Sequence, residues 1–123
     1  MPSCFSTVQV LSGRIYMIGG LVKDIIMKNT FQIDENLVYE EMALMKVGRF
    51  NTPVTLLKDK YILAAGGQTS TTKNKFTSSA ELFDINSNKW ITLESMQKPR
   101  SNTSLCQVQN RFVFIFHGLG SAV

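Results

Sequence analysis

The sequence contains few side chains that could carry out a reaction. Its single histidine, His117, cannot build a metal site alone, because transition-metal sites combine several imidazole, thiolate or carboxylate ligands. Cys4 and Cys106 are the only thiols and lack C-x-x-C spacing, so we expect two small apolar residues in a reducing compartment, with a mutual disulfide as the alternative. Neither a catalytic triad nor a phosphate-binding loop is present. The sequence therefore predicts a non-catalytic protein with no cofactor and no metal.

Two aspartates resemble a pair of catalytic carboxylates at first sight. Asp34 and Asp84 each follow an apolar run and each begin a short polar turn. Aspartate is common at this place because its side chain accepts hydrogen bonds from the backbone amides that follow it. We therefore interpret both residues as structural.

Composition and length indicate a globular protein. The chain has 123 residues, of which 44% are hydrophobic and 18% charged, and its net charge is +4. No apolar run approaches the roughly 18 residues that a membrane-spanning helix needs. No basic residue precedes Arg14, so the N-terminus does not resemble a secretory signal. These features predict a cytoplasmic or nuclear protein without a membrane segment.

An internal repeat organises the chain. Arg49-Phe-Asn-Thr returns as Arg100-Ser-Asn-Thr, at an offset of 51 residues. The same offset pairs further residues without a gap, among them Met45 with Met96, Tyr61 with Phe112 and Gly67 with Gly118. An earlier glycine doublet, Gly19-Gly20, lies 47 residues before Gly66-Gly67. The sequence therefore predicts three units: residues 4–45, residues 46–96, and a half unit at residues 97–123.

Each complete unit is expected to contain four β-strands. Short runs rich in β-branched and aromatic residues alternate with turn residues, and no segment keeps a helical period. The expected strands of the first unit are residues 5–11, 14–18, 27–34 and 38–42, and those of the half unit are residues 102–108 and 111–116. In the runs RIYMI and YILAA, consecutive residues are apolar, so apolar side chains point to both faces of the expected strand. This pattern predicts strands that are covered on both sides.

The second unit carries a recognisable motif. It has Gly66-Gly67 after a strand, Phe83-Asp84 at the end of the next, then Trp90, Met96 and Arg100. This pattern resembles the Kelch repeat, in which units of about 50 residues form the four-stranded blades of a β-propeller. The resemblance implies an all-β fold, a partial Kelch-type propeller of about two and a half antiparallel blades. The first unit departs from the motif with Tyr39 in place of tryptophan, and the half unit has His117 before Gly118.

Blades cannot bury their faces alone, so an incomplete ring needs an explanation. Three remain open: the chain is part of a longer propeller, it assembles with other copies of itself, or it survives as a small arc. The structural motif residues should specify the fold in each case. They are Gly19, Gly20, Gly66, Gly67, Asp84, Trp90 and Gly118.

The blade topology predicts one basic face. Loops between second and third strands, together with links between units, should share one end of the blades. This end receives eight basic residues and a single acidic one: Lys23, Lys28, Lys46, Arg49, Lys73, Lys75, Lys98 and Arg100 against Asp24. Arginine binds carboxylates through a planar fork. The hypothesis is that Arg49, Asn51, Arg100 and Asn102, with Lys73 and Lys75, bind an acidic protein segment.

Alternatives to this hypothesis stay open. In the alternative, Arg49 and Arg100 tie one unit to the next by bonding backbone carbonyls, and Lys73 and Lys75 are solvated loop residues. Nucleic acid is disfavoured as a partner because no aromatic residues are interleaved with the basic ones. Two function classes therefore remain: a protein-interaction module, such as a substrate receptor or cytoskeletal scaffold, and an inert piece of a longer propeller that is itself an enzyme.

Overall fold

Two four-stranded antiparallel sheets dominate the structure, a computed structural model that describes residues 3–73, 75–96, 100–101, 105–108, 112–115 and 119–120. Side chains are described for residues 3–73 and 75–96. The first sheet consists, in spatial order, of β1 (Ser6–Gln9), β2 (Ile15–Ile18), β5 (Thr30–Ile33) and β6 (Tyr39–Glu41). The second sheet consists of β7 (Val54–Leu57), β8 (Tyr61–Ala65), β9 (Ala80–Asp84) and β10 (Lys89–Thr92).

Three shorter pairs of strands complete the fold. A hairpin of β3 (Leu21–Val22) and β4 (Ile25–Ile26) lies in the connection from β2 to β5. Near the C-terminus, β12 (Leu105–Val108) pairs with β13 (Phe112–Ile115), and β11 (Arg100–Ser101) pairs with β14 (Leu119–Gly120). The sequence predicted the β12–β13 hairpin, but it gave no signal for β3–β4 or for β11–β14.

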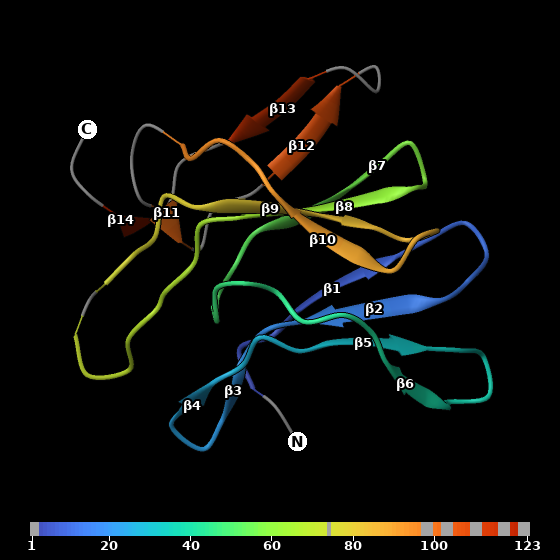
Figure 1. Ribbon diagram of the computed structural model, residues 1–123, viewed down its shortest axis with the longest axis horizontal. Coiled ribbons are helices and arrows are strands. Elements are labelled where there is room, and N and C mark those ends of the chain that lie inside the picture. The colour runs from blue at the N-terminus through green and yellow to red at the C-terminus, as the bar shows by residue number, and fades with distance from the viewer. Residues whose placement is uncertain are drawn as a thin grey trace.

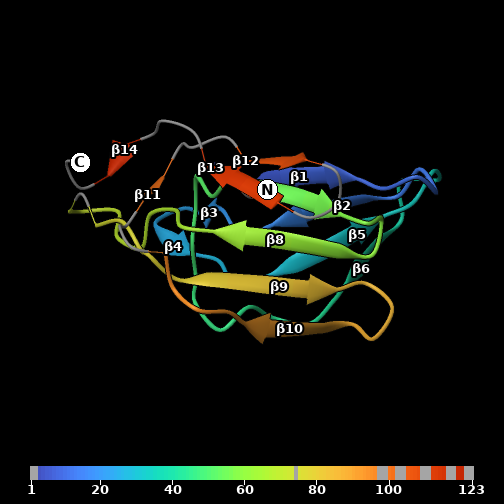
Figure 2. The same cartoon turned by 90° about the horizontal axis from the view of Figure 1, so that it is seen from above.

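The first strands of successive units lie side by side. β1 contacts β7, and β7 contacts β12, so the two sheets and the β12–β13 hairpin follow one another as blades do (Figures 1 and 2). The described residues contain no helix, and none therefore forms a helix long and apolar enough to span a bilayer. The predicted fold class is confirmed: the described residues form an all-β arrangement of antiparallel four-stranded sheets, consistent with partial propeller blades of Kelch type.

The main core fills the space between the two sheets. Tyr16 and Ile18 of the first sheet meet Ile62, Ala64 and Phe83 of the second, and all five are buried. A second cluster lies on the opposite face of the second sheet, around Leu63, Ala65 and Ala80. β8 is therefore covered on both faces, as YILAA predicted. β2 is covered less completely, because Ile15 is 37% exposed.

Trp90 connects the two sheets. Its indole Nε1 donates hydrogen bonds to Thr30 Oγ1 at 3.0 Å and to the Ala43 carbonyl at 3.1 Å, both in the first unit. Its ring packs against Phe83, with ring centroids 5.1 Å apart. The ring lies between neighbouring sheets, as the sequence predicted.

The glycine doublets adopt backbone conformations that other residues rarely reach. The φ angles are +65° and +101° at Gly19 and Gly20, and +81° and +99° at Gly66 and Gly67. A Cβ on Gly67 would lie 2.2 Å from the Thr52 hydroxyl oxygen. Both the positive φ and the close approach therefore require glycine after the second strand of each unit.

The repeated aspartates stabilise turns. Asp34 Oδ1 accepts hydrogen bonds from the amides of Asn36 and Val38 at 2.9 and 3.0 Å. Asp84 Oδ1 accepts from the amides of Asn86 and Ser87 at 3.0 and 3.3 Å. The structural interpretation of these carboxylates is thus supported, and it accounts for their recurrence.

Candidate functional site

The connections between strands gather at two opposite ends of the sheets (Figure 1). The loop end, as we call it, comprises the β3–β4 hairpin, the link at residues 42–53 and the loop at residues 66–79. The turn end comprises the tight turns at residues 10–14, 34–38, 58–60 and 85–88. The sequence assigned the candidate binding residues to the loop end.

Arg49 occupies the link between the two sheets, and its side chain is fully buried. Nη2 lies 2.8 Å from Glu81 Oε2 in an ion pair and donates to Ser79 Oγ at 2.8 Å. Nη1 donates to the carbonyl oxygens of Gly66 at 3.0 Å and Ser79 at 2.9 Å. Burial lowers the pKa of Arg49, while the adjacent Glu81 carboxylate opposes that shift. Both terminal nitrogens of the guanidinium are therefore bonded to groups of the second unit.

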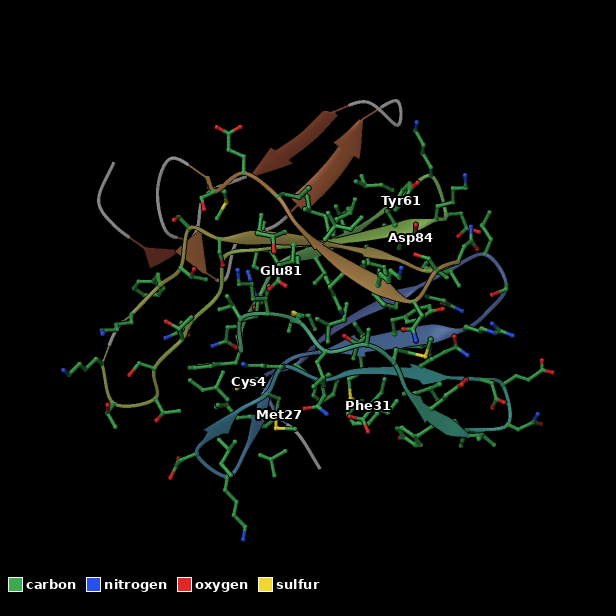
Figure 3. The ribbon with its side chains drawn as sticks, in the orientation of Figure 1. Cys4, Met27, Phe31, Tyr61, Glu81 and Asp84 are labelled. Atoms are coloured by element: carbon green, nitrogen blue, oxygen red, sulfur yellow. The ribbon has the colours of Figure 1, made fainter. Side chains whose placement is uncertain are left out.

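Glu81 completes the attachment of this link. It is 1% exposed, and Figure 3 places it on β9, on the side toward the first unit. Its Oε1 accepts a hydrogen bond from the Lys46 amide at 2.7 Å, and Oε2 accepts one from the Val47 amide at 3.2 Å. A buried carboxylate needs such partners, because an unpaired charge in the interior is costly. Arg49 and Glu81 together hold the link against the second sheet.

This geometry corrects the expectation that Arg49 presents its charge to a partner. A side chain that is 0% exposed and already bonded to Glu81, Ser79 and Gly66 offers no donor at the surface. The structure favours the alternative role, in which the arginine ties one unit to the next. Arg49 therefore leaves the set of residues that we consider for binding.

Asn51 helps to position a neighbouring polar side chain. Its φ is +51°, its amide donates to the Cys4 carbonyl at 3.0 Å, and Nδ2 donates to Gln68 Oε1 at 2.8 Å. Phe50 and Gln68 also exchange two backbone hydrogen bonds, of 3.1 and 2.8 Å. The link and the long loop are thus fastened together at Gln68.

A cleft of about 310 Å³ opens at the loop end, between the β3–β4 hairpin and the long loop. Phe50 and Leu21 supply its apolar lining, and Asp24 stands on the hairpin side. The remaining lining residues come from the long loop: Gln68, Ser70, Thr71, Thr72 and Lys73. The cleft is rich in hydrogen-bonding groups.

Exposed lysines are frequent at the loop end, and one of them, Lys73, lines the cleft. The loop end presents five exposed lysines among the described residues: Lys23, Lys28, Lys46, Lys73 and Lys75. Asp24 is exposed beside Lys23, and Glu94 is exposed after β10, whereas Glu81 is buried against Arg49. The loop end therefore remains basic at its surface without a contribution from Arg49.

Several predicted residues lie outside the described side chains. Asn102, Lys98, His117 and Gly118 fall outside the described residues, and for Arg100 only the backbone in β11 is described. The structure therefore neither brings Arg100 and Asn102 to the cleft nor separates them from it. Their roles stay predictions, as do the boundaries proposed for the three units.

Sequence reasoning missed three residues of this region. Glu81 was assigned to a strand without a role, although a charged residue among the apolar residues of AELFD was a signal of buried pairing. Gln68 gave no signal, and Asp24 was assigned to this end without a role in a cleft, because both places depend on how the hairpin and the loop approach each other across two units. Contacts of that kind are not periodic in sequence.

A second cleft, of about 300 Å³, lies at the turn end. It is lined by Ser12, Arg14, Asp34, Glu35 and Asn36. The Asp34 carboxylate already accepts two backbone hydrogen bonds within its own turn. We therefore regard the loop end as the better candidate for a binding site.

Comparison with known protein families identifies the repeat in the second sheet. Residues 56–97 match the family model described as the Kelch motif. The matched segment includes the end of β7 and all of β8, β9 and β10. No match was found among curated proteins. The matched segment is the one whose glycines, aspartate and tryptophan suggested the resemblance in the sequence.

Proposed function

The chain carries a Kelch repeat, a module that generally mediates protein–protein interaction, and on this premise we propose that its loop end binds an acidic segment of a partner protein. The observation that carries the proposal is the cleft between the β3–β4 hairpin and the long loop, flanked by exposed Lys73 and Lys75. Lysines attract carboxylates over several ångströms and so steer acidic chains toward a surface.

The proposed contact residues differ from those that the sequence suggested. Lys73 and Lys75 supply positive charge at the long loop, Asn51 acts by holding Gln68, and Arg100 and Asn102 are proposed to extend the same surface. Arg49 takes no direct part. Kelch repeats are generally non-enzymatic, and we propose the same for this chain.

The biological setting is also a proposal. A surface of this kind would serve a substrate receptor or a cytoskeletal scaffold, in the cytoplasm or nucleus. A second candidate, a structural part of a longer propeller, is favoured by the partly open outer face of the first sheet, where Ile15 is 37% and Tyr39 52% exposed while Met17 and Ile33 are buried. In that case further blades, or other copies of the chain, are the relevant partners.

Charge reversal at the loop end tests the main proposal. Lys73→Glu with Lys75→Glu should weaken binding of a fluorescent glutamate-rich peptide about tenfold at low salt, measured by anisotropy, and rising salt should abolish the difference. Lys58→Glu with Lys60→Glu is the matched control at the turn end, where both lysines are exposed. Equal affinity of the two double variants would reject the loop end as the binding surface.

A further inference from the structure

We infer that the cleft of the loop end recognises a mixed-charge peptide segment, with an acidic side chain at Lys73 and a basic side chain at Asp24. The inference rests on the proposed function and narrows it, because a purely acidic segment would be a poor fit to part of this cleft. Its basis is the distribution of charge on the two sides of the cleft.

The two sides of the cleft carry opposite charges on different units. Asp24 belongs to the β3–β4 turn of the first unit, and Lys73 belongs to the long loop of the second. Both side chains are exposed, and among the described residues the ion pair found is that of Arg49 with Glu81. Asp24 and Lys73 therefore do not neutralise each other across the cleft, and each is available to a ligand of opposite charge.

The space between these charges is neutral and hydrogen-bonding. Phe50, which is 7% exposed, and half-buried Leu21 form its apolar part, while the Gln68 amide lies between. Gln68 Oε1 is engaged by Asn51, so the amide nitrogen is the atom of Gln68 left to donate to a ligand. A peptide carbonyl is a suitable acceptor for it.

The side formed by the long loop is held in shape by its own hydrogen bonds. Ser70 Oγ accepts from the amides of Thr72 and Lys73 at 3.4 and 3.2 Å, and the Thr69 amide donates to the Lys75 carbonyl at 3.0 Å. Such preorganisation reduces the entropy that binding must cost. The backbone of Lys73 is therefore tied to Ser70 on the long-loop side of the cleft.

Asp24 makes the cleft selective. Within the cleft, a carboxylate that approaches Asp24 meets a like charge, a repulsion that neighbouring Lys23 reduces, whereas an ammonium or guanidinium group there forms a pair. A segment with acidic groups alone can use Lys73 but is repelled at Asp24. The charge pattern thus sets both the composition and the direction of the bound segment.

Three peptides of equal length test this inference with the intact chain. One carries an acidic and a basic residue separated by neutral residues, the second has glutamine in place of the basic residue, and the third has glutamine in place of the acidic one. The mixed peptide should bind about two- to fivefold more tightly than either glutamine-substituted peptide. This difference in affinity is the range expected for one exposed ion pair.

Two conservative variants identify the residues responsible. Asp24→Asn should weaken binding of the mixed peptide about two- to fivefold. It should strengthen binding of the acidic peptide, because the repulsion by Asp24 is removed. Lys73→Gln should weaken binding of both peptides. Asparagine is well tolerated in turns, and a melting curve verifies that each variant folds. Glu35→Gln and Lys58→Gln at the turn end are matched controls and should change neither affinity.

The outcomes separate this inference from the proposed function. If Asp24→Asn leaves the mixed peptide unchanged or tighter while Lys73→Gln still weakens the acidic peptide, the mixed-charge inference is overturned and the acidic-partner proposal stands. If Lys73→Gln affects no peptide, both are overturned. Weakening of the mixed peptide by both variants, with the acidic peptide strengthened by Asp24→Asn alone, supports the inference.

Discussion

The two sheets present equivalent faces to different surroundings. The face of the second sheet that carries Ile62, Phe83 and Trp90 packs against the first sheet, and Ile62 and Phe83 are 0% exposed. The counterparts of Ile62 and Trp90 in the first sheet are Ile15 and Tyr39, which are 37% and 52% exposed. Ile33, the counterpart of Phe83, is also buried, at 8% exposed, so the outer face of the first sheet is open at Ile15 and Tyr39 and closed between them.

The buried Arg49–Glu81 ion pair of the second unit has no equivalent in the first unit. The bridges Ser3↔Leu21 and Phe50↔Gln68 lie 47 residues apart and align the two links. By this alignment Pro2 is the sequence counterpart of Arg49, and counting back from Asp34 and Asp84 makes Phe31 the counterpart of Glu81. Figure 3 shows Phe31 on β5, on the side away from the second sheet. The first unit thus lacks counterparts of both partners in the buried ion pair, although Arg49 itself recurs as Arg100 at the repeat offset.

Loss of Arg49 should have the largest effect on stability. Arg49→Met leaves the buried Glu81 carboxylate without its cation, which should lower the free energy of unfolding by about 3–5 kcal/mol in chemical denaturation. Arg14→Met removes an exposed arginine directly before β2 and should lower the free energy of unfolding by less than about 0.5 kcal/mol. Similar losses for both variants would contradict the buried ion pair.

Truncation of Trp90 should come next. Trp90→Ala removes a ring packed on Phe83 and two hydrogen bonds to the first unit, and we expect a loss of about 3 kcal/mol. Tyr39→Ala, at the counterpart position on the partly open outer face, should cost less than about 1 kcal/mol. Thermal melts of the two variants give the comparison, and a smaller loss for Trp90 than for Tyr39 would contradict it.

Glycine substitutions should not distinguish the two units. Gly67→Ala and Gly20→Ala each place a Cβ within 3 Å of their own unit, at Thr52 Oγ1 and at the Ser3 carbonyl, with φ near +100°. Each should therefore cost about 2 kcal/mol. Denaturant midpoints measure this directly. A large loss for Gly67→Ala alone would mean that the neighbouring sheet, and not the local turn, requires the glycine.

The turn aspartates should give the smallest and most similar effects. Asp84→Ala and Asp34→Ala each remove two hydrogen bonds from an exposed turn, at an expected cost of about 1 kcal/mol apiece. The turn end does not depend on the covering sheet, so the two losses should agree in parallel melts. A difference of more than about 1 kcal/mol would show that one turn has a further tertiary role.

Local features were predictable from the sequence because they depend on neighbours in the chain. The glycine doublets, the aspartate turns and the strand runs follow from backbone conformation and alternation, and Trp90 could be placed between sheets because its unit matches a known repeat. These elements fix the fold class. They give no information about which loops come together.

The binding region could be predicted only in outline. Topology assigned the basic residues to one end. It could not show that the Arg49 guanidinium forms a buried ion pair with Glu81, a residue 32 positions away. Nor could it show that Asp24 and Lys73, from different units, line one cleft. Both facts depend on side-chain distances between units, which strand periodicity does not encode.

A titration followed by amide chemical shifts in NMR tests the central claim, that the loop end is the binding surface. The ligand is the mixed-charge peptide, added to the isotope-labelled chain. The account predicts that the largest shifts fall at the β3–β4 turn around Asp24 and in the loop from Gln68 to Lys75, with little change at residues 10–14, 34–38 and 58–60. Shifts concentrated at those three turns, or no saturable shifts at the loop end, would contradict it.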